Sequence, residues 1–157
     1  MFSDNPNFTI LLVEDDDNDV LLIQKALKKG FVNNPIHIAR NGQEAIDYLS
    51  GKGAFADRDK YFFPDVVITD LKMPKVTGFD LLIWINDNPQ FRVIPTIVLT
   101  SSRHDADVTR AYFLGANTYM VKPTDFETQA EMIKLIRDYW AISIKPPAGR
   151  FRKLEAV

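Results

Sequence analysis

The chain has 157 residues, of which 46% are hydrophobic and 25% are charged, and its formal net charge is −2. This length and composition are typical of one globular domain with a sizeable core. The small net charge gives no reason to expect binding to nucleic acid or another polyanion. Because the sequence has no cysteine, disulfides and thiolate metal sites are excluded.

The N-terminus shows no targeting segment. It lacks the basic start and the apolar run of a signal peptide, and no apolar segment approaches the roughly 20 residues that cross a bilayer. A cysteine-free chain is compatible with a reducing compartment. We therefore expect a cytoplasmic protein with no membrane partner.

Five short apolar segments have the length and composition of buried strands: residues 8–13, 36–39, 65–70, 94–99 and 117–121. Each is followed by apolar residues at helical spacing, beginning near Val20, Asn41, Gly78, Asp105 and Thr124. Strands that alternate with helices predict an α/β protein with a parallel sheet covered on both faces. We expect five strands in the doubly wound order 2-1-3-4-5, with five helices on both faces.

Local signals mark several helix ends. Pro89 is expected to close the helix that begins near Gly78, and the last helix is expected to run to about Ile142. Two pairs match the sequence form of a capping box, Asn41 with Glu44 and Thr124 with Glu127.

Two stretches fall outside this alternation. Residues 51–64 form a long connection with four aromatic side chains, so we expect it to fold back onto a domain that spans residues 1–144. Residues 145–157 form a basic tail with two prolines, too short to be an output domain. The tail is either a solvated end or an arm that docks on a partner or a second subunit.

Asp70 lies where the third strand should leave the core. The β-branched run of residues 66–69 stops at this carboxylate, and Pro74 and Gly78 follow, which favours a turn. A carboxylate at the edge of the core requires charge partners or a metal. The alternative is that Asp70 only caps a loop or a helix.

Polar residues follow the other strands at the same edge of the sheet, where doubly wound proteins bind ligands. Glu14, Asp15 and Asp16 follow the first strand, Thr100 the fourth and Lys122 the fifth. Converging carboxylates repel one another unless a hard cation lies among them, and Mg²⁺ suits such oxygen donors. Asp70 is then the candidate nucleophile for a phosphoryl group, and Thr100 and Lys122 can share the charge on the transferring oxygens.

The motifs together resemble the receiver domain of two-component response regulators. They are LLVEDD, TDLKMPKVTG, VLTSS and YMVKP, in this order between about residues 8 and 142. The resemblance implies the CheY-like (flavodoxin-like) fold, phosphorylation of Asp70 by a histidine kinase and a Mg²⁺ cofactor. It also implies that the protein catalyses only its own phosphorylation and dephosphorylation.

The resemblance also assigns the remaining site residues. Asp15 and Asp70 become direct Mg²⁺ ligands together with the backbone carbonyl of Lys72, and Glu14 acts mostly through water. The switch and phosphate-binding residues are Thr100, Tyr119 and Lys122, and the Lys122–Pro123 peptide is expected to be cis. Asp16 has no role in the family pattern and is interpreted as a helix-start charge.

A finer resemblance concerns the partner. The aromatic connection, the segments NPQFRVIPTIVLTSS and GANTYMVKP, and the Tyr139-Trp140 ending resemble stand-alone receivers of the phytochrome-associated type. This implies a light-sensing histidine kinase upstream and no fused output domain. We expect the output to be protein binding or a homodimer formed through the fourth helix, fifth strand and fifth helix.

Lys72 departs from the short polar residue that many relatives have beside the acceptor. It is either a solvated loop lysine or a charge that slows dephosphorylation.

Two other classes of protein compete with the receiver-domain interpretation. A flavin-type electron carrier shares the fold, but the acidic residues 14–17 would repel its cofactor. A Mg²⁺ phosphatase with an Asp nucleophile usually has a second Asp where this chain has Lys72.

Overall fold

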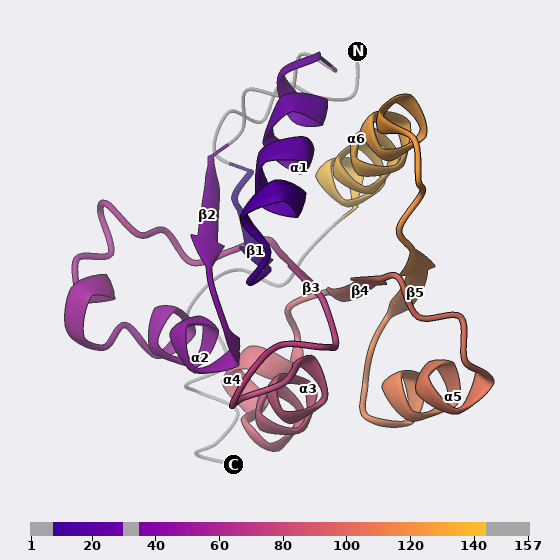
Figure 1. The fold of residues 1–157 in the computed structure, drawn as a ribbon. Helices are drawn as coiled ribbons and strands as arrows, with labels where there is room; N and C mark the ends of the chain where they lie inside the picture. The colour runs from indigo at the N-terminus through magenta and orange to yellow at the C-terminus, as the bar shows by residue number, and fades with distance from the viewer. Residues whose placement is uncertain (1–7, 30–34, 144–157) are drawn as a thin grey trace.

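The computed structural model describes residues 8–29 and 35–143. Five parallel strands form one sheet in the order β2-β1-β3-β4-β5 (Figure 1). The strands are β1 (Ile10–Val13), β2 (Ile36–Ala39), β3 (Val66–Thr69), β4 (Thr96–Thr100) and β5 (Thr118–Val121). The doubly wound order predicted from the sequence is therefore confirmed.

The described helices are α1 (Asp17–Lys29), α2 (Gly42–Ser50), α3 (Gly78–Asp87), α4 (Pro89–Arg92), α5 (Asp105–Phe113) and α6 (Phe126–Ile142). Helices α1 and α6 cover one face of the sheet, and α2 to α5 lie on the other (Figure 1). Alternate strand residues pack into the two cores: Leu12 and Ile68 lie with α1 and α6, whereas Leu11 and Val67 lie with α2 and α3. This alternation explains why the strands are apolar throughout.

The expectation of five helices is wrong, because Pro89 begins a sixth. Asn88 has an extended backbone (φ −112°) that ends α3, and Pro89 then occupies the first turn of α4. Proline is favoured there because its φ is already helical and its missing N–H would have no partner in the helix. Phe91 of α4 is buried beside Trp84, with ring centroids 5.0 Å apart.

The helix caps correct two sequence expectations. The Asn41 side chain accepts from Glu44 N at 2.9 Å as expected, but the Glu44 carboxylate accepts from Arg40 N. Helix α6 is capped by Asp125, which accepts from Thr128 N, and not by Thr124. The complete capping box belongs to Thr77 and Asp80 at the start of α3. It was missed because the usual sequence form of this motif has Glu or Gln at the third helical position.

The connection over residues 51–64 folds back onto α2, as predicted. Tyr48 lies among the rings of His37, Phe55 and Tyr61, with centroid distances of 5.3 to 6.0 Å. The Tyr48 hydroxyl donates to the Phe62 carbonyl at 2.6 Å, and burial raises the pKa of Tyr48 to about 12. The connection is therefore part of the domain.

The expected tail, residues 145–157, lies outside the described residues, as does the last residue of the expected domain. None of the helices in the described segments is long and apolar enough to cross a membrane.

Candidate functional site

The sheet register brings the first and third strands to the same edge. Val13 is paired with Thr69, so Glu14 and Asp70 leave the sheet side by side. Asp70 N donates to the Val13 carbonyl at 3.1 Å, which extends this alignment by one residue. Lys122 N donates to the Thr100 carbonyl at 2.8 Å, so the fourth and fifth strands end at the same level.

Gly78 packs directly against the backbone carbonyl of Asp70. A Cβ at position 78 would lie 2.0 Å from the Asp70 carbonyl oxygen, so no side chain fits there. Gly78 N also donates to the Leu71 carbonyl at 3.0 Å. The start of α3 therefore packs directly on the chain that carries Asp70, and the Asp70 Oδ1 accepts from Leu71 N at 2.6 Å.

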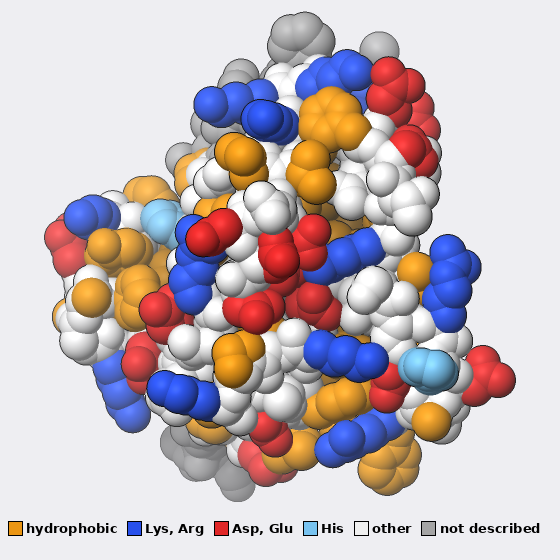
Figure 2. Space-filling view, viewed as in Figure 1, with side chains coloured by type: hydrophobic (Ala, Val, Ile, Leu, Met, Phe, Trp, Pro, Cys, Tyr) orange, Lys and Arg blue, Asp and Glu red, His pale blue; other side chains and the backbone are white. Residues whose placement is uncertain are grey.

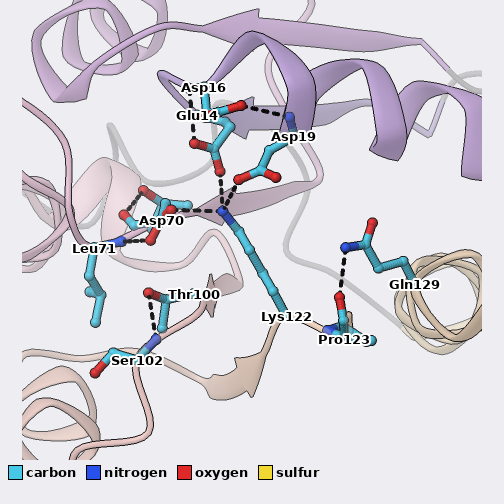
Figure 3. Close-up of polar contacts among 11 residues, drawn as sticks. Glu14, Asp16, Asp19, Asp70, Leu71, Thr100, Ser102, Lys122, Pro123 and Gln129 are labelled. Atoms are coloured by element: carbon cyan, nitrogen blue, oxygen red, sulfur yellow. Dashed lines mark hydrogen bonds and ion pairs between the residues drawn. The ribbon is translucent and has the colours of Figure 1, made fainter. Parts of the chain in front are cut away.

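The Lys122 ammonium lies among three carboxylates (Figure 3). Its Nζ is 2.6 Å from Glu14, 2.8 Å from Asp19 and 2.8 Å from Asp70. An ammonium has three N–H donors, and all three are used here. Glu14 is 2% exposed, whereas the side chains of Lys122 and Asp70 are both 11% exposed. The cluster is largely buried, and Asp19, at 33%, is its most exposed member.

The electrostatics follow from this burial. Desolvation raises the pKa of Glu14 to about 7, although Lys122 acts in the opposite direction. Burial alone would lower the pKa of Lys122, but the hydrogen bonds to the three carboxylates outweigh it and hold that pKa above its ordinary value. The three carboxylates therefore favour the charged form of Lys122.

The residues that follow β4 form a second polar group. Thr100 is buried, and its Oγ1 accepts from Ser102 N at 3.4 Å. The Tyr119 hydroxyl donates to the Ser102 carbonyl at 2.9 Å, and the Ser102 hydroxyl donates to Asp107 of α5. Burial raises the pKa of Tyr119. Ser102 thus connects the predicted switch residues Thr100 and Tyr119 to α5.

The structure brings together most of the residues selected from the sequence. Glu14, Asp70 and Lys122 are in one cluster, and Thr100 lies at the same edge (Figure 3). Asp15 is exposed and is not one of the three grouped carboxylates, so its role as a metal ligand stays a prediction. Asp16 accepts from Asp19 N at 3.0 Å, which confirms that it acts at the start of α1.

Asp19 is the site residue that sequence reasoning missed. It lies in the first turn of α1, next to Val20, which begins the buried face of that helix. An acid directly before the core face of the helix, two residues after the acidic run of residues 14–17, was the available signal. The sequence interpretation placed Glu14 and Asp15 in the metal site and assigned no role to Asp19.

Two further expectations concern the neighbouring loops. The described residues contain no cis peptide bond, so the peptide between Lys122 and Pro123 is trans. The predicted cis bond is therefore wrong. Trans is the default for X–Pro unless tertiary contacts select cis; here the trans loop places Lys122 on its carboxylates, and the Pro123 carbonyl accepts from Gln129. The Lys72 side chain is exposed and makes no hydrogen bond or ion pair with the described residues.

The donor set fits a hard divalent cation. Oxygens of Glu14, Asp19 and Asp70 lie within 4.8 Å of one another, and carboxylate oxygens are ligands that Mg²⁺ prefers. The cluster already holds one positive charge, the Lys122 ammonium. Acidic side chains also gather at the centre of the face shown in Figure 2. The residues present are therefore compatible with the predicted magnesium site.

Fold and site together define the class: a doubly wound α/β domain with an acidic, lysine-containing cluster at the carboxyl edge of its sheet. The chain belongs to the response regulator receiver domain family, whose model matches residues 10–134. This confirms the family resemblance recognised in the sequence.

The relatives narrow this class. Response regulator Rcp1 of Synechocystis is 33% identical over 145 residues, covering 92% of this chain and 97% of the relative. The crystal structure of the phosphorylated cyanobacterial phytochrome response regulator RcpA has a TM-score of 0.81 at 32% identity, with coverage of 90% and 99%. The bacteriophytochrome response regulator AtBRR has a TM-score of 0.72 at 39% identity, with coverage of 90% and 97%. The protein is therefore related to phytochrome-associated regulators.

Proposed function

We propose that the protein accepts a phosphoryl group on Asp70 from a histidine kinase, with Mg²⁺ as cofactor. The observation that carries the proposal is the 2.8 Å contact between Asp70 and Lys122 in a cluster with two further carboxylates. A carboxylate nucleophile needs a cation beside it to receive a phosphoryl group, which is itself negative. The crystal structure of RcpA is that of its phosphorylated form, which is consistent with this chemistry.

The positions of the residues support the following roles. The Asp70 carboxylate attacks phosphorus, the phosphorus–nitrogen bond of the donor phosphohistidine breaks, and the imidazole leaves with the electron pair. Lys122 and the Thr100 hydroxyl bind the transferred oxygens. Glu14 and Asp70 would hold Mg²⁺, which neutralises charge on the phosphoryl group when it is bound.

Asp15 and the backbone carbonyl of Lys72 complete the predicted ligand set. A Mn²⁺-bound crystal structure of Rcp1, with a TM-score of 0.76 at 32% identity over 89% of this chain and 99% of that one, supports a divalent cation in this family.

The direct test is labelling with a small phosphodonor. Incubation with phosphoramidate and Mg²⁺ should give one phosphoryl group per chain by intact-mass measurement, and none in Asp70→Asn or without the metal. Many turnovers of released phosphate would instead favour the alternative, a Mg²⁺ phosphatase-type hydrolase. That alternative needs a general acid two residues after the nucleophile, and position 72 carries an exposed lysine.

The proposed upstream partner is a light-sensing histidine kinase of the phytochrome class, working in the cytoplasm. The support is the similarity to RcpA and AtBRR, which are named as phytochrome and bacteriophytochrome response regulators. Phosphotransfer from purified phytochrome kinases, compared with kinases of other sensor classes, tests this part. Transfer that is no faster from phytochrome kinases would contradict it.

The proposed output is self-association through α5, β5 and α6, which correspond to the fourth helix, fifth strand and fifth helix expected from the sequence. Leu135, Tyr139 and Ile142 are exposed along one stripe of α6, and Phe113 at the end of α5 is 87% exposed. Exposed apolar side chains at this spacing are suited to a helix-mediated interface. Light scattering before and after phosphorylation should show a change in mass that Leu135→Lys abolishes.

A further inference from the structure

Asp19 has no role in the proposed phosphoryl transfer, yet it is one of the three carboxylates that hold Lys122. Its Oδ2 lies 2.8 Å from Nζ, the same distance as the phosphoacceptor. Asp19 is 33% exposed, whereas Glu14 is almost fully buried. The start of α1 fixes its backbone, because Asp19 N donates to the Asp16 side chain at 3.0 Å.

The other two partners of Lys122, Glu14 and Asp70, are also proposed metal ligands. If Mg²⁺ binds oxygens of Glu14 and Asp70, the cation and the Lys122 ammonium compete for the same carboxylates, and their like charges repel. The ammonium must then give up at least part of its contact with Glu14 and Asp70. The ligand set of the proposed function does not include Asp19, so in that arrangement its carboxylate remains available to Lys122.

A small cavity lies next to both groups. It is situated between α1 and α6 and is lined by Asp19, Ile23, Lys122, Gln129 and Met132, among others. Lys122 and Asp19 therefore share one cavity wall as well as an ion pair. Figure 3 shows Asp19, Glu14 and Asp70 grouped around the Lys122 ammonium.

We propose that Asp19 is the positioning residue for Lys122: it retains the ammonium when the metal takes over Glu14 and Asp70, and so keeps it within reach of the phosphoryl group on Asp70. This inference rests on the proposed function and adds a residue to it. Asp19 acts through Lys122 and contacts neither the metal nor the phosphoryl group in this role.

Metal binding alone tests the inference without any phosphoryl transfer. Titration with Mn²⁺, followed by the electron paramagnetic resonance of the free ion, should show at least about fivefold weaker binding in Asp19→Asn. The matched control is Asp17→Asn, which removes the same charge from the same helical turn but faces Arg40. It should weaken binding by clearly less, and Asp19→Glu, which keeps the charge, should restore binding towards the wild-type value.

A double-mutant cycle separates positioning from direct metal binding. In a Lys122→Met background no ammonium remains to be held, so Asp19→Asn should weaken Mn²⁺ binding no more than Asp17→Asn does. An equal loss from Asp19→Asn in both backgrounds would overturn the inference, since Asp19 would then act on the metal itself. Equal effects of Asp19→Asn and Asp17→Asn in the wild-type background would overturn it as well.

A second readout is the rate of phosphoryl transfer, which depends on the position of Lys122. At saturating Mg²⁺, single-turnover labelling by phosphoramidate should be about tenfold slower in Asp19→Asn, because a misplaced ammonium cannot stabilise the transferring oxygens. Unchanged labelling would contradict the positioning role. If the wild type takes up no phosphoryl group at all, the proposed function fails. The double-mutant cycle on Mn²⁺ binding still tests whether Asp19 positions Lys122.

Discussion

The α-carbon of Gly78 lies against the backbone carbonyl of Asp70. The contact is so close that a Cβ would stand 2.0 Å from the carbonyl oxygen and 2.8 Å from the α-carbon of Leu71. Backbone atoms cannot move aside as the end of a flexible side chain can. The first residue of α3 therefore helps to fix the backbone of the turn that carries Asp70.

Gly78→Ala should accordingly damage both stability and labelling. We expect the free energy of unfolding to fall by about 2 kcal/mol or more, since an overpacked site must shift its backbone. Urea denaturation measures the stability, and phosphoramidate labelling measures the function. Asp87→Asn, an exposed position in the last turn of the same helix, is the control. An equal loss there would mean that α3 as a whole had been weakened.

Ser102 and Tyr119 give a second prediction. Ser102→Ala removes the hydroxyl that donates to Asp107 but keeps the carbonyl that accepts from Tyr119. It should cost about 1 kcal/mol of stability, and it should weaken the response of α5 to phosphorylation while Asp70 is still labelled. Amide hydrogen exchange of α5 with and without phosphodonor provides the measurement. A full response in Ser102→Ala would show that the hydroxyl is not needed.

Lys75 has a left-handed backbone, with φ of 65°, in the loop between Asp70 and α3. A residue with a Cβ is strained there, whereas glycine is not. Lys75→Gly should therefore stabilise the protein by up to about 1 kcal/mol in urea denaturation, despite the extra entropy of the unfolded chain. Lys72→Gly, in the same loop but without a left-handed backbone, should not stabilise it. A loss of stability in Lys75→Gly would contradict the strain.

Lys72 itself is a candidate for setting the lifetime of the phosphorylated state. Its side chain is exposed, without a partner in the described part of the chain, and two residues from Asp70. We expect its charge to pair with the phosphoryl group or hinder the attacking water. Lys72→Asn should then lose the phosphoryl group several-fold faster, measured by intact mass after removal of the donor. Equal lifetimes would leave Lys72 as a solvated loop residue.

The lowered pKa of His37 predicts that the stability of the protein depends on pH. Burial among Tyr48 and Tyr61 lowers its pKa below the ordinary 6.5. Between the two pKa values the unfolded chain binds more protons than the folded one, so stability falls as pH falls below about 6.5. Denaturation at pH 7.5 and 5.5 should show this loss, and His37→Gln should reduce it. A pH dependence unchanged in His37→Gln would assign the effect to other groups.

Much of the fold could be predicted because it depends on local patterns. Continuous apolar strands that alternate with helical spacing are compatible with few arrangements other than a parallel sheet with two covered faces. The start of α4 could not be predicted, since Pro89 suits both the end of one helix and the first turn of the next. The cap of α6 was misassigned by one residue for a similar reason: Thr124 and Asp125 are both good capping residues.

The sequence by itself determined that Glu14, Asp70 and Lys122 lie with Thr100 at one edge of the sheet, because parallel strands end at one edge. Only the tertiary structure decided which acid of residues 14–19 joins Glu14 around the Lys122 ammonium. Helix α1 begins at Asp17, so its first turn directs Asp19 towards Lys122 and leaves Asp15 exposed. Order along the chain fixes which residues leave the sheet together, but the direction of a side chain depends on where the next helix begins and how it packs.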